Sequence, residues 1–344
     1  MCLKWGSSMD DIYPILAVID QPGEKVVATI IRVNGSAYKK EGSSMIFFED
    51  GSYAGLLSAG CLETDLAIQV QKVFGSQEAM MHQYDLREET DLGWGQGSGC
   101  NGTIDILLEP VTEKLKEDFL LLKRLLDSYK PVIGLKKLNE LGEYLFIEEK
   151  GEPFGNWSGQ VPVIGFTSKS GIMGGSSVFQ HTYQPKPRLI VFGAGPDAKP
   201  LVSLAAETGF SVVVCDWREE FCQEKNYPAA DKLLVGFPDE LLNQLSFSHY
   251  DFVVIMSHHF QRDQEILSGL LHENIRYLGV LGPGERTRRL LNDDDIPNWI
   301  YAPMGVTIGA KGPVEIAVSV VAEMIEVWRK PVHERVELIW TIPD

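Results

Sequence analysis

The chain has 344 residues, of which 44% are apolar and 23% charged, and it carries a formal net charge of −17. These values are ordinary for a soluble protein, and the length is sufficient for two domains with sizeable cores. The negative charge argues against nucleic acid and anionic membranes as partners, because phosphate groups bind to basic surfaces. No apolar run approaches the length of a bilayer span. We therefore expect a cytoplasmic protein.

The five cysteines indicate neither a disulfide framework nor a zinc knuckle. Their number is odd, and no two of them form a Cys-x-x-Cys pair. In the cytoplasm we expect all of them to be reduced. They are Cys2, Cys61, Cys100, Cys215 and Cys222.

The first half of the chain predicts a mixture of strands and helices after a short N-terminal helix. Runs of β-branched and aromatic residues between turn residues predict strands, and apolar residues three or four positions apart predict helices. The predicted strands are 26–32, 44–48, 103–108, 132–134, 144–147 and 161–166, and the predicted helices begin just after residue 61 and at about residue 113.

Two cysteines lie in short glycine-rich segments, at residues 58–63 (SAGCLE) and 97–102 (GSGCNG). Glycine lets the backbone approach a ligand closely. Cys61 also precedes a predicted helix, whose dipole favours the thiolate, although Glu63 opposes this slightly. A single cysteine is most often a small buried filler. Two of them in such similar settings favour a function, and a soft metal or a sulfur-bearing cofactor is their natural ligand.

The second half begins with a predicted mononucleotide-binding βαβ unit. A buried strand at 188–192 leads into a G-x-G-x-x-A motif at 193–198, and the strand after the next helix ends at Asp216. In such units the glycines admit a pyrophosphate at the helix N-terminus, and the acid binds a ribose hydroxyl. The alternative is the same fold without a nucleotide, since Pro196 removes one donor. The sequence leaves both interpretations open.

Two further strand ends carry polar residues. In a doubly wound parallel sheet, ligands bind at the carboxyl ends of the strands. His258 follows a predicted strand at 252–256, as an acid/base group or metal ligand or as part of an ordinary polar turn. Gly282 and Arg286 follow the strand at 277–281, where they suit an anionic ligand or an ordinary helix N-terminus.

The prolines at positions 185 and 187 mark the predicted linker. We predict an α/β chain with an N-terminal mixed α+β domain at 1–184, a C-terminal Rossmann-like, doubly wound parallel-sheet domain at 185–330, and a tail at 331–344. The last predicted helix has a broad apolar face that suits the core or a contact between two copies of the chain, so we expect a homodimer.

Together these features resemble the xanthine dehydrogenase accessory proteins, which are grouped with the carbon monoxide dehydrogenase accessory proteins. The resemblance covers nearly the whole chain. It rests on residues 33–36, Gly51, Gly55, 58–63, 99–102, 187–195, Ser257-His258 with Asp263, 279–282, 303–305, 308–309, Pro313, 315–317, Ser319 and 322–323.

The resemblance implies a protein that binds molybdenum cofactor, assists its sulfuration and delivers it to a xanthine dehydrogenase-type apoenzyme, without itself oxidising purine. A cysteine desulfurase is a further candidate partner. The alternative function is an NAD-dependent oxidoreductase that uses the C-terminal domain. The candidate catalytic residues are Cys61, Cys100, Glu63 and His258, with the two cysteines as possible molybdenum contacts. The candidate cofactor-binding residues are Ser58, Gly60, Gly99, Gly102, Gly193, Gly195, Asp216, Gly282 and Arg286.

Overall fold

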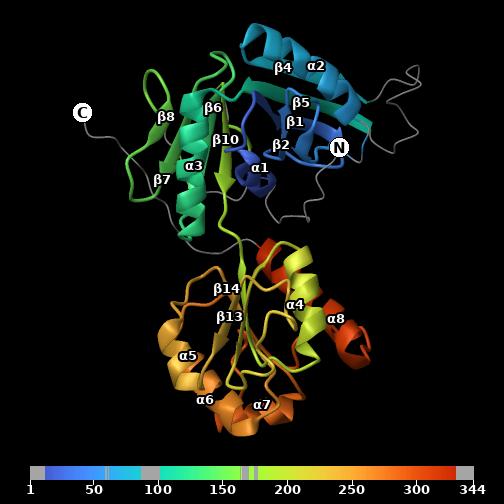
Figure 1. Ribbon diagram of the computed structural model, residues 1–344, viewed down its shortest axis with the longest axis vertical. Helices are drawn as coiled ribbons and strands as arrows, with labels where there is room; N and C mark the ends of the chain where they lie inside the picture. Colours follow the sequence, from blue (N-terminus) through green and yellow to red (C-terminus); the bar gives the residue numbers. More distant parts are fainter. Residues whose placement is uncertain are drawn as a thin grey trace. The chain divides into compact units, whose positions relative to one another are not determined.

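The computed structural model describes residues 12–58, 60, 62–86, 101–162, 164, 170–173 and 177–330. These residues form two compact units, one up to Pro185 and the other from Lys186 (Figure 1). Cys61, Gly99 and Cys100 lie outside the described residues, as do 163, 165 and 166 of the strand predicted at 161–166, while 161, 162 and 164 belong to no strand.

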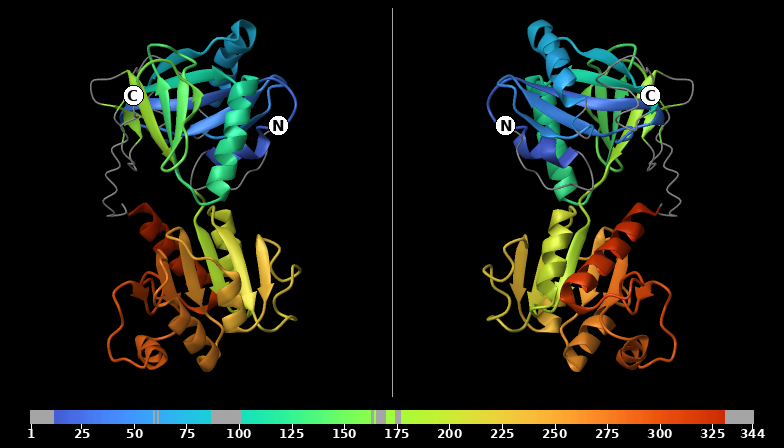
Figure 2. Two further views of the ribbon diagram at one scale, coloured as in Figure 1. Left: turned by 90° about the vertical axis from the view of Figure 1, so that its left-hand side faces the viewer. Right: turned by 90° about the vertical axis from the view of Figure 1, so that its right-hand side faces the viewer.

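Unit 1 contains two antiparallel sheets of five strands each, in the orders β3-β2-β1-β5-β4 and β8-β7-β6-β10-β9. In both views of Figure 2 the blue strands of the first sheet and the green strands of the second form separate groups. The strands of the first sheet are β1 (Lys25–Ser36), β2 (Ser44–Phe48), β3 (Tyr53–Gly55), β4 (Met80–Asp85) and β5 (Asn101–Pro110). Those of the second are β6 (Val132–Lys137), β7 (Tyr144–Glu148), β8 (Phe154–Asn156), β9 (Gly171–Ile172) and β10 (Val178–Tyr183).

Strand β1 is buried on both faces over its first seven residues, which explains why all of them but Lys25 and Thr29 are apolar. Val26 and Ala28 belong to the cluster beneath helix α2 (Glu63–Ser76). Val27 points the opposite way, into the cluster formed with α1 (Ile12–Val18) and α3 (Glu113–Asp127). The alternation follows from the two-residue period of a strand.

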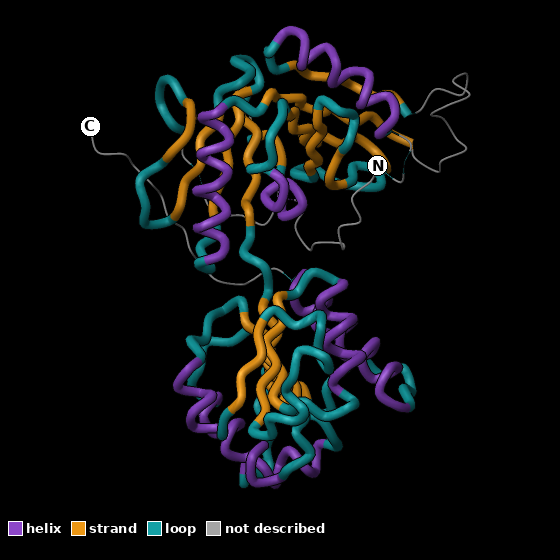
Figure 3. The backbone as a smooth tube through the Cα atoms, viewed as in Figure 1, coloured by secondary structure: helices purple, strands orange, loops and turns teal. Residues whose placement is uncertain are grey.

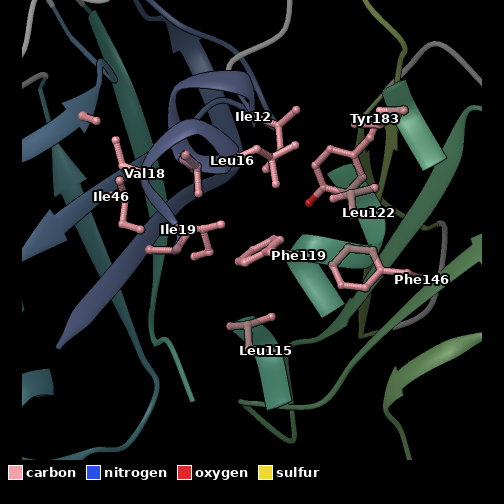
Figure 4. Packing of buried hydrophobic residues seen from close by; sticks show 14 of the residues in the cluster. Ile12, Leu16, Val18, Ile19, Ile46, Leu115, Phe119, Leu122, Phe146 and Tyr183 are labelled. Atoms are coloured by element: carbon pink, nitrogen blue, oxygen red, sulfur yellow. The ribbon is translucent and has the colours of Figure 1, made fainter. Parts of the chain in front are cut away.

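Helix α3 packs its apolar side against residues of both sheets. Figure 4 shows Phe119 and Leu122 facing Phe146 and Tyr183 of the second sheet, with Ile46 of the first sheet in the same cluster. These side chains are fully or almost fully buried. Thr112 caps the helix, since its hydroxyl accepts a hydrogen bond from the Leu115 amide.

A buried ion pair also joins the two sheets of unit 1. Glu109 on β5 and Lys136 on β6 are 3% and 6% exposed, and the Lys136 ammonium donates to the Glu109 carboxylate. Water does not solvate these buried charges, so the removal of either residue would leave the other as an uncompensated buried charge.

Unit 2 is a single parallel sheet of six strands in the order β13-β12-β11-β14-β15-β16. Figures 1 and 3 show helices on both of its faces. Helix α4 packs against α8, and α6 packs against both α5 and α7. The predicted doubly wound, Rossmann-like fold is thereby confirmed. The strands are β11 (Arg188–Phe192), β12 (Ser211–Asp216), β13 (Lys232–Val235), β14 (Asp251–Ile255), β15 (Tyr277–Val280) and β16 (Ile300–Tyr301). The helices are α4 (Ala198–Glu207), α5 (Pro238–Gln244), α6 (Phe260–Leu270), α7 (Gly284–Leu291) and α8 (Gly312–Arg329).

Over the described ranges, no helix combines the length and the hydropathy that a bilayer crossing needs.

Candidate functional site

The segment that leads to Cys61 is held by one buried carboxylate. Glu63 is the first residue of α2 and is only 5% exposed. One of its oxygens accepts hydrogen bonds from the amides of Leu57 (3.1 Å) and Ser58 (2.7 Å), and the other accepts from the Ser58 hydroxyl. The Ser58 oxygen in turn accepts from the Leu62 amide at 2.9 Å. The carboxylate at the start of α2 is therefore bonded to residues 57 and 58, and the Ser58 side chain is bonded to Leu62 as well.

Gly60 lies in this segment with its backbone toward open space. Its φ is +100°, and among the residues that the structure describes an added Cβ would meet no atom within 4 Å. This conformation favours glycine, and the open side leaves room for a ligand. Every hydrogen bond described for the Glu63 carboxylate is donated by Leu57 or Ser58. Glu63, predicted as a catalytic residue, thus holds Leu57 and Ser58, which precede Cys61 in the sequence.

Gly102, the predicted ligand contact beside Cys100, is needed for strand pairing. It lies in β5 opposite Gly35 of β1. An added Cβ would come within 2.2 Å of the Asn34 carbonyl oxygen, so any side chain would push the strands apart. Its own carbonyl accepts from the Leu86 amide at 2.8 Å.

The described residues on either side of the two cysteines share one buried cluster. Leu57 and Leu62 flank Cys61, while Leu86 and Ile104 lie on the two sides of the segment that contains Cys100. All four belong to the cluster beneath α2. The fold therefore brings the anchors of the two segments to the same part of unit 1.

In unit 2, the glycine motif forms the expected turn between β11 and α4. Gly193 has a φ of +122°, and an added Cβ would lie 2.6 Å from the Met256 carbonyl oxygen. At Gly195 an added Cβ would instead meet a carboxylate oxygen of Asp197 at 2.8 Å. The other Asp197 oxygen pairs with the His258 Nε2 at 2.5 Å. His258 has a φ of +60°, and its side chain is 62% exposed.

Asp216 ends β12 as predicted, but its carboxylate is 1% exposed and engaged on both oxygens. It accepts from the Ala194 amide at 2.6 Å and from the Arg218 amide and guanidinium at 2.8–2.9 Å. Burial alone would raise the pKa of Asp216, but these hydrogen bonds outweigh burial and lower it below its usual value.

Arg286 pairs with a buried carboxylate of the chain. Its guanidinium donates to Asp263 at 2.6 Å, and Asp263, which is 1% exposed, also accepts from the Ser257 hydroxyl. Gly282, with a φ of +109°, forms the turn before α7. The Arg286 charge thus compensates Asp263, and His258 lies with Asp197 instead of with Asp263.

Asp197 and Arg218 were not among the predicted site residues. Asp197 occupies an unspecified position of the G-x-G-x-x-A motif, and Arg218 follows the strand-end acid by two residues, where no motif requires it. The presence of an acidic residue inside the glycine motif was the sequence feature that could have pointed to Asp197. Across the described ranges, no three His, Cys, Asp or Glu side chains gather as a metal site would require.

The described residues of unit 1 also line a hollow of about 640 Å³. It includes Glu109, Tyr144 and Asn156, and none of the predicted site residues borders it. Its buried polar groups are already paired, because Glu109 binds Lys136 and the Tyr144 hydroxyl donates to Asp118 at 2.8 Å.

The two antiparallel sheets of unit 1 and the parallel sheet of unit 2 define a protein with an antiparallel N-terminal part and a Rossmann C-terminal part, and comparison with known families agrees. Residues 19–85 match the model of the XdhC and CoxI family, residues 113–184 that of the BH1974-like central domain, and residues 189–324 that of the XdhC Rossmann domain.

The chain belongs to the XdhC and CoxI family, as its motifs predicted. It is 42% identical to a Bacillus subtilis protein named as a probable subunit of xanthine dehydrogenase, over 90% of this chain and 95% of that protein. It is 23% identical to the molybdenum cofactor insertion chaperone PaoD of Escherichia coli, over 88% of this chain and 83% of PaoD. A crystal structure described as a xanthine dehydrogenase (BH1974) of Bacillus halodurans is 47% identical, covers 95% of this chain and 98% of that one, and superimposes with a TM-score of 0.86.

Proposed function

We propose that this chain is a maturation factor that binds molybdenum cofactor, assists its sulfuration and inserts it into a xanthine dehydrogenase-type molybdenum hydroxylase. The observation that carries the proposal is the similarity to PaoD, a molybdenum cofactor insertion chaperone, across most of both chains. The Bacillus subtilis relative, whose name places it with xanthine dehydrogenase, supports the same client class.

The proposed contacts to the cofactor are Cys61 and Cys100. A thiolate is a soft donor that suits molybdenum or its sulfur ligands. Two features of the structure support a site beside Cys61: Glu63 holds the preceding turn, and the backbone at Gly60 faces open space. Gly99 would give Cys100 the same close approach. A cysteine desulfurase would supply the sulfur while the cofactor is held.

Cofactor retention and client activation test the proposal. The full chain is incubated with molybdenum cofactor, separated from free cofactor and assayed for bound pterin by fluorescence after oxidation. It is then added to the cofactor-free client hydroxylase. We expect retention and a rise in client activity with the wild type, and a loss of both by roughly tenfold or more in Cys61→Ser and Cys100→Ser. Cys2→Ser, outside both glycine-rich segments, is the control and should behave as the wild type.

Two results would exclude this function. A wild-type chain that neither retains the cofactor nor activates the client cannot be a maturation factor. A chain that oxidises xanthine by itself would be part of the enzyme. The names of the Bacillus subtilis and Bacillus halodurans proteins describe them in that way, as a probable subunit of xanthine dehydrogenase and as a xanthine dehydrogenase.

We further propose that the chain acts in the cytoplasm as a homodimer whose contact includes α8. Val314 and Val318, one helical turn apart on this helix, are 65% and 47% exposed. Apolar side chains in such a stripe are typical of contacts between protomers. Light scattering of the wild type and of Val318→Glu tests this, and we expect a dimer and a monomer respectively.

A further inference from the structure

We infer that the nucleotide groove of unit 2 is filled by the chain's own side chains, so that this Rossmann domain is closed to dinucleotides such as NAD. Three neighbouring positions carry the inference: the pyrophosphate, ribose and base positions of the groove. It concerns unit 2 alone and stands independently of the proposed cofactor site in unit 1.

The pyrophosphate position is taken by Asp197. The second glycine of the motif normally leaves space in which the backbone meets the pyrophosphate. Here the space beside Gly195 holds a carboxylate oxygen of Asp197, 2.8 Å from where a Cβ would stand. This negative charge lies at the N-terminus of α4, where an anionic ligand would bind. A pyrophosphate would therefore meet both a steric and an electrostatic obstacle.

The amides of the glycine loop are also largely committed. Pro196 has no N–H, and three neighbouring amides already donate within the chain. Gly193 donates to the Cys215 carbonyl, Ala198 to the Gly195 carbonyl, and Ala194 to Asp216. Residues 193, 194, 196 and 198 therefore offer no free amide to a phosphate group.

The crevice beside the loop is bridged as well. In this strand order the order reverses between β11 and β14, and ligands bind between the loops that follow those two strands. Asp197 belongs to the first of these loops and His258 to the second, and their 2.5 Å contact joins them. His258 makes this contact from a left-handed backbone conformation, with a φ of +60°.

The ribose and base positions are closed in the same way. Asp216, which would accept a ribose hydroxyl, is buried and bonded to Ala194 and Arg218. The Arg218 guanidinium lies over the Trp217 ring at 4.5 Å. Trp217 in turn contacts His259 in the loop after β14, with ring centroids 5.6 Å apart. The Trp217 ring that could stack on a base is thus covered by the Arg218 guanidinium and met edge-to-face by His259.

Calorimetric titration of the full chain with NAD⁺ and with inorganic pyrophosphate tests the inference. We expect no saturable binding of either compound to the wild type at millimolar concentration. Asp197→Ala removes both the charge and the volume, and we expect it to bind pyrophosphate saturably, at a concentration at least roughly tenfold below the highest at which the wild type shows no binding. The Asp197 side chain makes no capping hydrogen bond to α4, so the helix should persist. Asp197→Asn, which removes the charge and keeps the shape, serves if the alanine variant unfolds.

Asp239→Ala is the matched control, because Asp239 is an exposed carboxylate in the first turn of α5. It should leave pyrophosphate binding unchanged. Saturable binding of NAD⁺ to the wild type would overturn the inference, as would the absence of any gain in both Asp197 variants. Neither result bears on cofactor retention by Cys61 and Cys100, so the two proposals fail separately.

Discussion

Replacing Glu63 by alanine should loosen the turn before Cys61 without unfolding the rest of the chain. The change removes the acceptor of three hydrogen bonds, from the Leu57 amide, the Ser58 amide and the Ser58 hydroxyl. A buried donor left without a partner costs about 1–3 kcal/mol. Because the turn borders open space at Gly60, water can satisfy some of these donors, so we expect a cost of about 2–4 kcal/mol in local opening.

Hydrogen exchange of a peptide that begins at least two residues before Leu57 and runs to Leu62, followed by mass spectrometry, measures this opening. A cost of about 2–4 kcal/mol corresponds to exchange roughly 30- to 700-fold faster at the Leu57 and Ser58 amides. Glu63→Gln keeps one acceptor oxygen and should fall between the alanine variant and the wild type. Glu78→Ala is the control, since Glu78 is an exposed carboxylate on the same unit.

Unchanged exchange of these two amides in Glu63→Ala would refute the assignment of Glu63 as the residue that holds the turn. Faster exchange together with undiminished cofactor retention would separate the turn from the proposed function. We expect both properties to change together, because a thiol contact depends on a fixed backbone.

Three further predictions concern buried ionisable groups. In urea denaturation, Glu109→Gln and Lys136→Met should each lower the free energy of unfolding of unit 1 by about 3–5 kcal/mol. The double variant should lose much less than the sum of the two single losses, and additive losses would show that the two groups are not paired. Burial raises the pKa of Cys222 to about 11 and also raises that of Cys215, so at pH 8 only about one Cys222 thiol in a thousand is ionised. Native labelling with iodoacetamide should therefore spare both thiols, and labelling in urea should modify both, as mass spectrometry would show. The pKa of Asp216 is lowered in the folded state, so its stabilisation is present above its unfolded pKa of about 3.9 and is lost as the pH falls below it. Asp216→Asn should flatten the fall in the thermal stability of unit 2 between about pH 5 and pH 3, and an unchanged pH profile would contradict the assigned hydrogen bonds.

Local sequence patterns were sufficient for most of the secondary structure. The helix predicted to begin at about residue 113 is α3, and the strand predicted at 188–192 is β11, because apolar periodicity and turn residues act over a few neighbours. They did not predict how the strands of unit 1 divide into two sheets. The buried pair Glu109–Lys136 joins strands whose partners are chosen by contacts far apart in the chain.

The sequence by itself determined the family, the Rossmann unit and the two glycine-flanked cysteine segments, because each depends on residue types at fixed short spacings. Only the tertiary structure decided what the polar residues contact. Glu63 turns back to bind residues 57 and 58, and Arg286 binds Asp263. Asp197, 61 positions before His258, meets it across the crevice where a nucleotide would lie. A motif specifies the backbone turn, but the space left by its glycines is filled by whichever side chain the fold brings there.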